Sequence, residues 1–311
     1  MTRLVVGFVG GTGRLGSVLV QALIDADNYE IRLVLRPGID YQSPNSQIMV
    51  VRADRTSEPA LTSALRGCDV VVNVLGDRAP VEGHFTVLRA VLVAGIKRYI
   101  PSQWGNTPNT EALGAVPFLQ SKLGVNKEVE KAAQQGSVTF TTIAGGPWFE
   151  YLFEHPGMMS MPERVFLMHE SPDVVFGVSS RETFAAALVG VLDNLEDTKN
   201  KHLNVNLALL SQKQALKLAQ EALPGEVIKT IPRSYDERYK TGLEKVLSGV
   251  TDTHTFSDVL SKVIFDPKVN VQPGYLDNDM LGVKLATDEE IRELLRQAST
   301  SERYKPKAAA S

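Results

Sequence analysis

The sequence has little of several features that mark particular classes of protein. Its 311 residues include one cysteine, Cys68, which excludes an internal disulfide and a zinc site built from several thiolates. It has no apolar run long enough to span a bilayer, and its first residues lack the layout of a signal peptide. The 33 Lys and Arg against 36 Asp and Glu leave no basic field for nucleic acid or an anionic membrane. We therefore expect a cytoplasmic protein whose partner is a small molecule, with no nucleic-acid or membrane partner.

Motifs of several enzyme classes are also missing. The patterns G-x-S-x-G and H-E-x-x-H do not occur, and there is no acidic metal-binding loop. The five histidines show neither i, i+4 pairing nor a nearby carboxylate pattern that would suit zinc. We therefore expect no metal site, and hydrolase and metalloprotease functions have no support.

Apolar runs typical of strands alternate with helical periodicity through the first half of the chain. The expected strands cover residues 4–9, 31–35, 47–51, 69–75, 98–101 and 138–143, and the expected helices cover 16–26, 59–65, 85–94 and 119–134. Strands that alternate with helices form a parallel sheet with helices on both faces. The order predicts an α/β fold with a doubly wound, mostly parallel sheet.

The regular alternation is lost after Pro147, where several further prolines follow. We place a sheet domain at residues 1–155 and a smaller, mostly helical substrate domain at 156–311, with the sheet revisited within 172–208. Strands are expected at 174–178 and 202–207, and helices at 181–192, 212–222, 235–248, 256–265 and 288–297. The last residues, 299–311, are polar and alanine-rich, and we expect a frayed tail.

A glycine pattern stands between the first strand and the first helix, the context in which such a pattern carries weight. Its candidate cofactor-binding residues are Gly10, Gly11, Thr12, Gly13, Arg14, Leu15 and Gly16. Gly10 allows a tight turn, Gly13 lets the backbone approach a pyrophosphate, and Gly16 lets helix and strand pack closely. A nucleotide loop of the triphosphatase kind is excluded because Ser17 stands where a lysine is required. The alternative is a glycine turn without function, but the pattern favours a Rossmann domain.

The end of the second strand indicates which dinucleotide is bound. In such folds this end faces the adenosine ribose, where an acidic residue would bind a free 2′-hydroxyl. Arg36 stands there instead and offers a guanidinium to a 2′-phosphate, with Arg14 able to share that role. This favours NADP(H), although a solvated surface arginine is the alternative. Asp54 is placed to contact the adenine, and Gly76 to let the backbone pass close to the ribose and pyrophosphate.

Two later segments resemble a known family. Residues 94–105 read AGIKRYIPSQWG, which is similar to the AGVKRFIPSEFG segment of isoflavone reductase-like and phenylcoumaran benzylic ether reductase-like proteins. These belong with the NmrA-like atypical short-chain dehydrogenases. Residues 118–122 read FLQSK, and Glu130 follows the lysine by eight positions, as in the family's helix with its active-site lysine. The resemblance covers about residues 4–155, with a weaker likeness over 174–192 and 211–223.

The resemblance implies an NADPH-dependent reductase of a small aromatic, enone or benzylic-ether type metabolite, with Lys122 as the catalytic and cofactor-contacting lysine. The chain departs from the family at three places. Gln103 replaces a glutamate, Trp104 replaces a phenylalanine, and His84 replaces a common glutamine. These departures bear on the substrate and on the reaction.

The chemistry of Lys122 can also be argued from the residues. Hydride transfer to a polarised carbon leaves negative charge that an ammonium can stabilise or protonate. The Tyr-x-x-x-Lys pair of ordinary short-chain dehydrogenases is absent, since no lysine has a tyrosine four positions before it. A solvated helix lysine is the alternative. Candidate substrate contacts are His84, Gln103, Trp104, Trp148 and Tyr151, for which core packing is the competing interpretation.

Two other functions remain open at this point. One is an NmrA-like sensor that binds NADP to bias a protein partner and needs no catalytic lysine. The other is a redox-neutral isomerase that uses the same cleft, against which the glycine pattern and Arg36 both count. A protein partner is expected only for the sensor.

Overall fold

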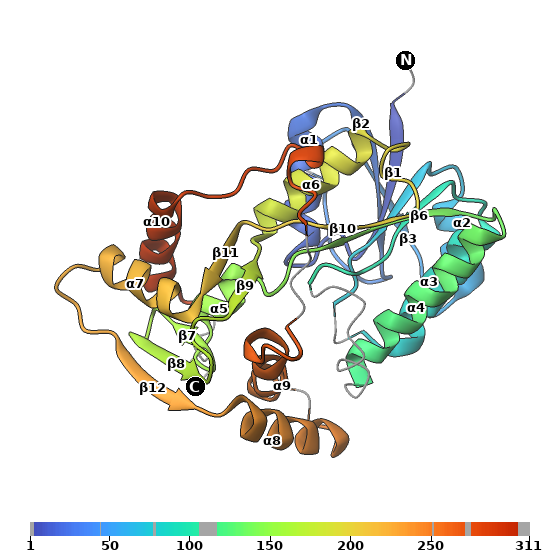
Figure 1. The fold of residues 1–311 in the computed structure, drawn as a ribbon. Coiled ribbons are helices and arrows are strands. Elements are labelled where there is room, and N and C mark those ends of the chain that lie inside the picture. The colour runs from blue at the N-terminus through green and yellow to red at the C-terminus, as the bar shows by residue number, and fades with distance from the viewer. Residues whose placement is uncertain are drawn as a thin grey trace.

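The computed structural model describes residues 3–43, 45–76, 79–105, 117–250, 252–270 and 275–303, with only the backbone for 117–121. A seven-stranded sheet is the centre of the fold (Figure 1). Its strands are β1 Leu4–Val9, β2 Tyr29–Leu35, β3 Ile48–Arg52, β4 Val70–Asn73, β5 Arg98–Ile100, β6 Thr139–Ala144 and β10 Lys201–Asn204. They lie in the order β10-β6-β5-β4-β1-β2-β3, and every neighbouring pair is parallel. The predicted α/β class is confirmed.

Helices cover both faces of this sheet, as Figure 1 shows. On one face lie α1 Gly16–Ala26 and α6 Arg181–Asp193, and on the other lie α2 Glu58–Leu65, α3 Val81–Val93 and α4 Pro117–Gln134. Successive side chains of a strand point to opposite faces. Phe8 of β1 therefore packs into the core under α1 and α6, whereas Val9 packs into the core under α2, α3 and α4. The short strand β4 is buried throughout because both faces are covered.

The second region has its own apolar core. It contains α5 Phe149–Glu154, β7 Met159–Ser160, β8 Val165–His169, β9 Val175–Val178, β11 Ala208–Ser211, α7 Gln212–Ala222, β12 Lys229–Arg233, α8 Tyr235–Leu247, α9 Thr253–Phe265 and α10 Asp288–Ser299. Phe153, Phe166 and Phe265 are fully buried in this core. In Figure 1, α8 and α9 lie below the sheet, and α7 and α10 lie to its left.

This region holds strands that the sequence analysis did not predict. β12, β8 and β7 form a three-stranded sheet, and β11 pairs with β9. β12 reads Lys-Thr-Ile-Pro-Arg and pairs in parallel with β8, more than sixty positions earlier in the chain. A short polar strand has no local apolar alternation, so its pairing depends on a distant partner. The predicted strand at 202–207 is shorter in the structure, where β10 ends at Asn204 in the large sheet, and the unpredicted β11 follows it in the small one.

The two regions are interleaved along the chain. After α9, residues 275–283 return to the large sheet, where Asp277 accepts a 2.8 Å hydrogen bond from the Asn204 backbone. Leu281, in the 3-10 helix Asp279–Leu281, is buried in the core under α1 and α6 before the chain reaches α10. Of the expected frayed tail, residues 299–303 are held: Ser301 and Arg303 both bond to Glu154 of α5. Residues 304–311 lie outside the described residues.

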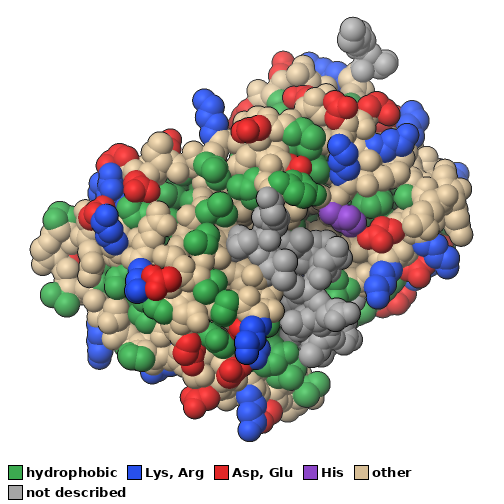
Figure 2. Space-filling view, in the orientation of Figure 1, with side chains coloured by type: hydrophobic (Ala, Val, Ile, Leu, Met, Phe, Trp, Pro, Cys, Tyr) green, Lys and Arg blue, Asp and Glu red, His purple; other side chains and the backbone are tan. Residues whose placement is uncertain are grey.

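The described residues contain no helix that is long and apolar enough to cross a membrane. On the face shown in Figure 2, acidic and basic side chains are interspersed over the visible surface.

Candidate cofactor and substrate site

The loop from Gly10 to Gly16 is shaped so that only glycine fits at several positions. Gly10 has a φ of 95°, and a Cβ there would lie 2.8 Å from the Val74 carbonyl oxygen. A Cβ on Gly16 would lie 2.7 Å from Gly11 Cα. The Gly13 amide donates a 3.0 Å hydrogen bond to the Gly10 carbonyl, which closes the turn. The glycines therefore let the backbone of the loop pass close to the end of β1.

The N-terminus of α1 opens onto this loop. Its cap residue, Leu15, supplies no side-chain hydrogen bond, and its first turn holds no acidic residue. Thr12, Gly13 and Arg14 are exposed. No side chain caps this end, although the Ser17 and Val18 amides donate to the Gly13 and Leu15 carbonyls at 2.9 Å. The helix dipole favours an anion at such an end. This arrangement fits a pyrophosphate, the group that the glycine pattern predicts.

A second arginine lies near Arg36. Arg36 is exposed directly after β2, and Arg55 is half-buried after the neighbouring strand β3. Burial lowers the pKa of Arg55, and the positive charge of Arg36 lowers it further. Two guanidinium groups that repel one another are stabilised by a shared anion. The sequence analysis missed Arg55, although its place after the third strand, adjacent to the second in such sheets, was a usable signal.

Asp54 and Gly76 also follow sheet strands. Asp54 is exposed, and its carboxylate accepts hydrogen bonds from the Thr56 backbone at 2.9 Å and hydroxyl at 2.8 Å. These bonds lower the pKa of Asp54. Gly76 is exposed after β4, and a Cβ there would meet no atom within 4 Å. The contacts predicted for these two residues with a nucleotide stay predictions.

Gln103 connects the loop after β5 to α4. Its side chain is buried, with 4% of the residue exposed, and its amide nitrogen donates a 3.1 Å hydrogen bond to the Lys122 carbonyl. Lys122 itself is half-buried. His84 is buried in the first turn of α3. Gln103 therefore holds the backbone of Lys122 through a hydrogen bond. An ionised glutamate at position 103 would have no hydrogen to donate to that carbonyl.

The two tryptophans differ in exposure. Trp104 is 5% exposed, donates its indole N–H to the Asn73 carbonyl at 2.9 Å, and packs edge-on against Phe184. Trp148 is half-buried and donates its indole N–H to the Trp104 carbonyl. Trp104 therefore lies in the core between β4 and α6, as the core-packing alternative predicts. Trp148 lies nearer the surface.

The hydroxyl of Tyr151 is bonded to α9. It lies 2.6 Å from the Ser257 hydroxyl, which lies 3.1 Å from His155 Nδ1 and 3.0 Å from the Thr253 carbonyl. The Gly157 amide donates to the same Nδ1, so this nitrogen is an acceptor. The Tyr151 hydroxyl has two acceptors within reach, the Ser257 hydroxyl and the Thr253 carbonyl at 3.4 Å, and both lie on α9. Its proton is directed into the protein.

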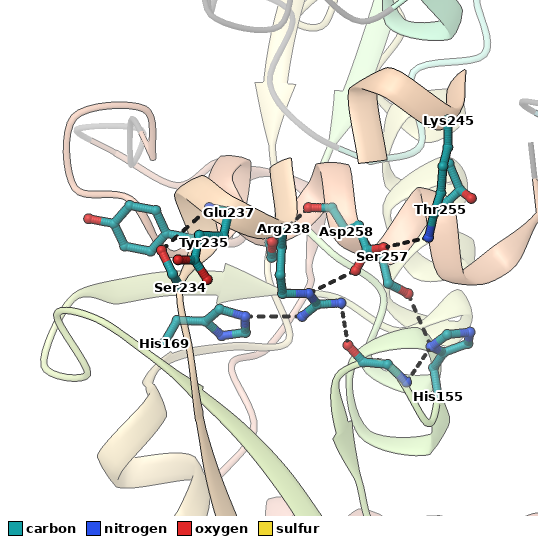
Figure 3. A network of polar contacts seen from close by, with 12 residues as sticks. His155, His169, Ser234, Tyr235, Glu237, Arg238, Lys245, Thr255, Ser257 and Asp258 are labelled. Atoms are coloured by element: carbon teal, nitrogen blue, oxygen red, sulfur yellow. Dashed lines mark hydrogen bonds and ion pairs between the residues drawn. The ribbon is translucent and has the colours of Figure 1, made fainter. Parts of the chain in front are cut away.

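Figure 3 shows the polar network around His155, which the sequence analysis missed. Arg238 of α8 donates to His169 Nε2 at 3.0 Å, to Asp258 of α9 at 2.9 Å and to the Gly157 carbonyl at 2.8 Å. Burial first, and then nearby positive charge, lower the pKa of His155 to about 4 and that of His169 to about 3. Both rings are therefore neutral acceptors near pH 7.

Most of the predicted site residues share one edge of the sheet. The glycine loop, Arg36, Asp54, Gly76, Gln103 and Trp148 each follow the carboxyl end of a different strand, and these strands are all parallel. Hence these residues lie along the carboxyl edge, where ligands bind in open α/β sheets. Trp104 lies at this edge but is buried. No group of three or more residues suited to holding a metal occurs in the described part of the chain.

Sequence comparison agrees with this geometry. A model of the NmrA-like family matches residues 2–304. The chain belongs to the NmrA-like family. An oxidoreductase of Aspergillus flavus, aprR, is 28% identical to this NmrA-like protein over 67% of the chain and 70% of its own length. The phenylcoumaran benzylic ether reductase POP1 of Populus trichocarpa is 25% identical over 54% of the chain and 59% of its own length.

A solved structure supports the fold. The complex of leucoanthocyanidin reductase with NADPH from Vitis vinifera superposes with a TM-score of 0.76. It is 15% identical in sequence, and the match covers 96% of this chain and all of that one. At that identity the likeness concerns the fold alone.

Proposed function

We propose that this NmrA-like protein is an NADPH-dependent reductase of a small aromatic, enone or benzylic-ether type molecule. The observation that carries the proposal is the glycine loop from Gly10 to Gly16 at the start of α1, where no side chain caps the helix, together with the two neighbouring arginines Arg36 and Arg55. Its relatives named as an oxidoreductase and a benzylic ether reductase support the reaction class.

In this proposal each part of the carboxyl edge binds a different part of the nucleotide. The backbone N–H groups of the loop and the dipole of α1 hold the pyrophosphate. Arg36 and Arg55 hold the 2′-phosphate, which supplies the negative charge that relieves their mutual repulsion. The preference for NADPH over NADH follows from that charge.

Lys122 is the candidate acid. When bound, the nicotinamide supplies a hydride, and the product then needs a proton or a nearby positive charge. Tyr151 is poorly suited to give that proton because the acceptors of its hydroxyl, Ser257 and the Thr253 carbonyl, lie on α9. Lys122 is anchored at its carbonyl by Gln103 and remains the group that can act. The ring of Tyr151, in the helix that follows β6, is a candidate contact for the substrate.

The experiment that tests this proposal is a calorimetric titration with NADPH and NADH of the wild type, Arg36→Ala and Arg55→Ala. We expect each variant to weaken NADPH binding about ten- to a hundredfold, with little change for NADH, because a charge-assisted phosphate contact is lost. Arg66→Ala is the matched control, since this exposed arginine follows the end of α2, on the opposite edge of the sheet. If the wild type bound neither nucleotide, the reductase and the sensor would both be excluded.

A substrate screen separates the reductase from the sensor. Consumption of NADPH, followed by absorbance, is expected with an aromatic or benzylic-ether substrate and the wild type. A protein that bound NADPH tightly but oxidised it with none of these compounds would favour the sensor.

A further inference from the structure

Asn126 has a buried amide without a hydrogen-bond partner. The residue is 4% exposed, and neither Nδ2 nor Oδ1 bonds to any group that the structure describes. More than nine in ten buried polar groups in proteins are hydrogen-bonded, because leaving a donor or acceptor unpaired costs about 1–3 kcal/mol. An amide that is unpaired at both ends therefore indicates a missing polar occupant.

The position of Asn126 relates it to Lys122. Both residues are on α4, four positions apart, so their side chains leave the same face of the helix about one turn from each other. This part of α4 is packed closely, since Val125 and Val129 are buried against the sheet and a Cβ on Gly124 would lie 3.0 Å from the Phe85 ring. The amide is enclosed beside the candidate lysine.

The enclosure limits what the occupant is. A nucleotide or an aromatic substrate needs an open path, and Asn126 has almost no exposed surface. Water is the polar molecule small enough for such a place, and buried waters commonly bond two to four polar groups. It can donate to Oδ1 and accept from an ammonium at the same time.

We propose that Asn126 binds an ordered water that accepts a hydrogen bond from the Lys122 ammonium and donates one to Asn126 Oδ1, which pairs the acceptor end of the amide and leaves Nδ2 unpaired. Asn126 is then a positioning residue. Gln103 holds the backbone of Lys122 through its carbonyl, and the water held by Asn126 fixes the far end of the same side chain. The functional meaning of this water rests on the proposed reductase activity, whereas its presence does not.

A crystal structure of the wild-type protein at high resolution tests the site directly. We expect a density peak within hydrogen-bond distance of both Asn126 Oδ1 and Lys122 Nζ. A dry site, or an Asn126 amide bonded to protein groups alone, would overturn the proposal.

The reactivity of Lys122 gives a second readout. Cyanate carbamylates amines only in their unprotonated form, and a hydrogen bond to an acceptor holds an ammonium protonated. In Asn126→Leu, which has similar size but no amide, carbamylation of Lys122 followed by mass spectrometry should be about tenfold faster, since a hydrogen bond to a charged group is lost. The exposed Lys127 on the same helix is the internal reference, and its rate should not change.

The same variants distinguish a failure of the water proposal from misfolding of the variant and from a failure of the proposed reductase function. A Leu variant that is more stable than the wild type, with unchanged Lys122 reactivity, would mean a dry unpaired amide and would overturn the proposal. If Asn126→Leu does not fold, Asn126→Ala removes the same amide without adding bulk and should show the same faster labelling. NADPH titration of the same preparations tests the proposed function separately, because wild-type binding with unaltered labelling in the variant would reject only the water.

Discussion

The side-chain amide of Gln103 donates a hydrogen bond of 3.1 Å to the backbone carbonyl of Lys122. Gln103 lies in the loop after β5, and Lys122 lies in the second turn of α4. The bond therefore ties the carboxyl edge of the sheet to the helix with the candidate acid. A glutamine does this as a donor, which an ionised glutamate is unable to do.

Replacing this donor should weaken the fold near the site. In Gln103→Glu a carboxylate would face the Lys122 carbonyl in a buried place, and we expect the free energy of unfolding to fall by about 1–3 kcal/mol. Urea denaturation measures the change. Gln135→Glu, at an exposed position after α4, is the control and should have little effect. Equal stability of the two variants would show that the bond contributes nothing.

Removing the candidate acid should separate catalysis from binding. Lys122→Ala is expected to abolish turnover while leaving NADPH affinity nearly intact, because the phosphates are held elsewhere. Steady-state kinetics and calorimetry on the same variant measure the two quantities. Lys127→Ala removes an exposed lysine of the same helix and should retain activity. Normal turnover of Lys122→Ala would reject its assignment as the acid.

Two glycine substitutions should have opposite effects on stability. Gly16→Ala places a Cβ 2.7 Å from Gly11 Cα, so we expect loss of both stability and NADPH binding. Gly83→Ala is the matched change in α3, where a Cβ meets no atom within 4 Å. It should raise the free energy of unfolding by about 0.5–1 kcal/mol through helix propensity. Thermal denaturation with and without NADPH distinguishes them, and equal behaviour would contradict the packing described for the loop.

The network of Arg238 predicts a dependence of stability on pH. Burial lowers the pKa of His155 to about 4 and that of His169 to about 3, from 6.5 in the unfolded chain. Between the lowered pKa of each histidine and 6.5, the unfolded state binds more protons than the folded state. The free energy of unfolding therefore falls as the solution is acidified below about pH 6.5. In His155→Gln this slope should be smaller between pH 6.5 and 4. Parallel curves for the variant and the wild type would contradict the lowered pKa of His155.

Several elements in both halves of the chain could be predicted closely from the sequence. The predicted helices 16–26 and 212–222 and the strand 4–9 coincide with α1, α7 and β1. Apolar period and glycine position are local properties, so they specify these elements before any tertiary contact forms. The short strands β7, β8 and β12 were not predicted, since β12 is polar and its pairing with β8 requires residues far apart in the chain.

The site divides in the same way. The sequence by itself predicted the glycine loop and the arginine at the end of the second strand, because order along the chain places these at the carboxyl edge. The family resemblance added the lysine on the helix after the fifth strand. Only the tertiary structure decided that Arg55 lies near Arg36 and that the amide of Asn126 is enclosed without a partner. The interaction between two charges and the burial of a polar group depend on which residues are close in space. That proximity is set by the packing of elements from distant parts of the chain.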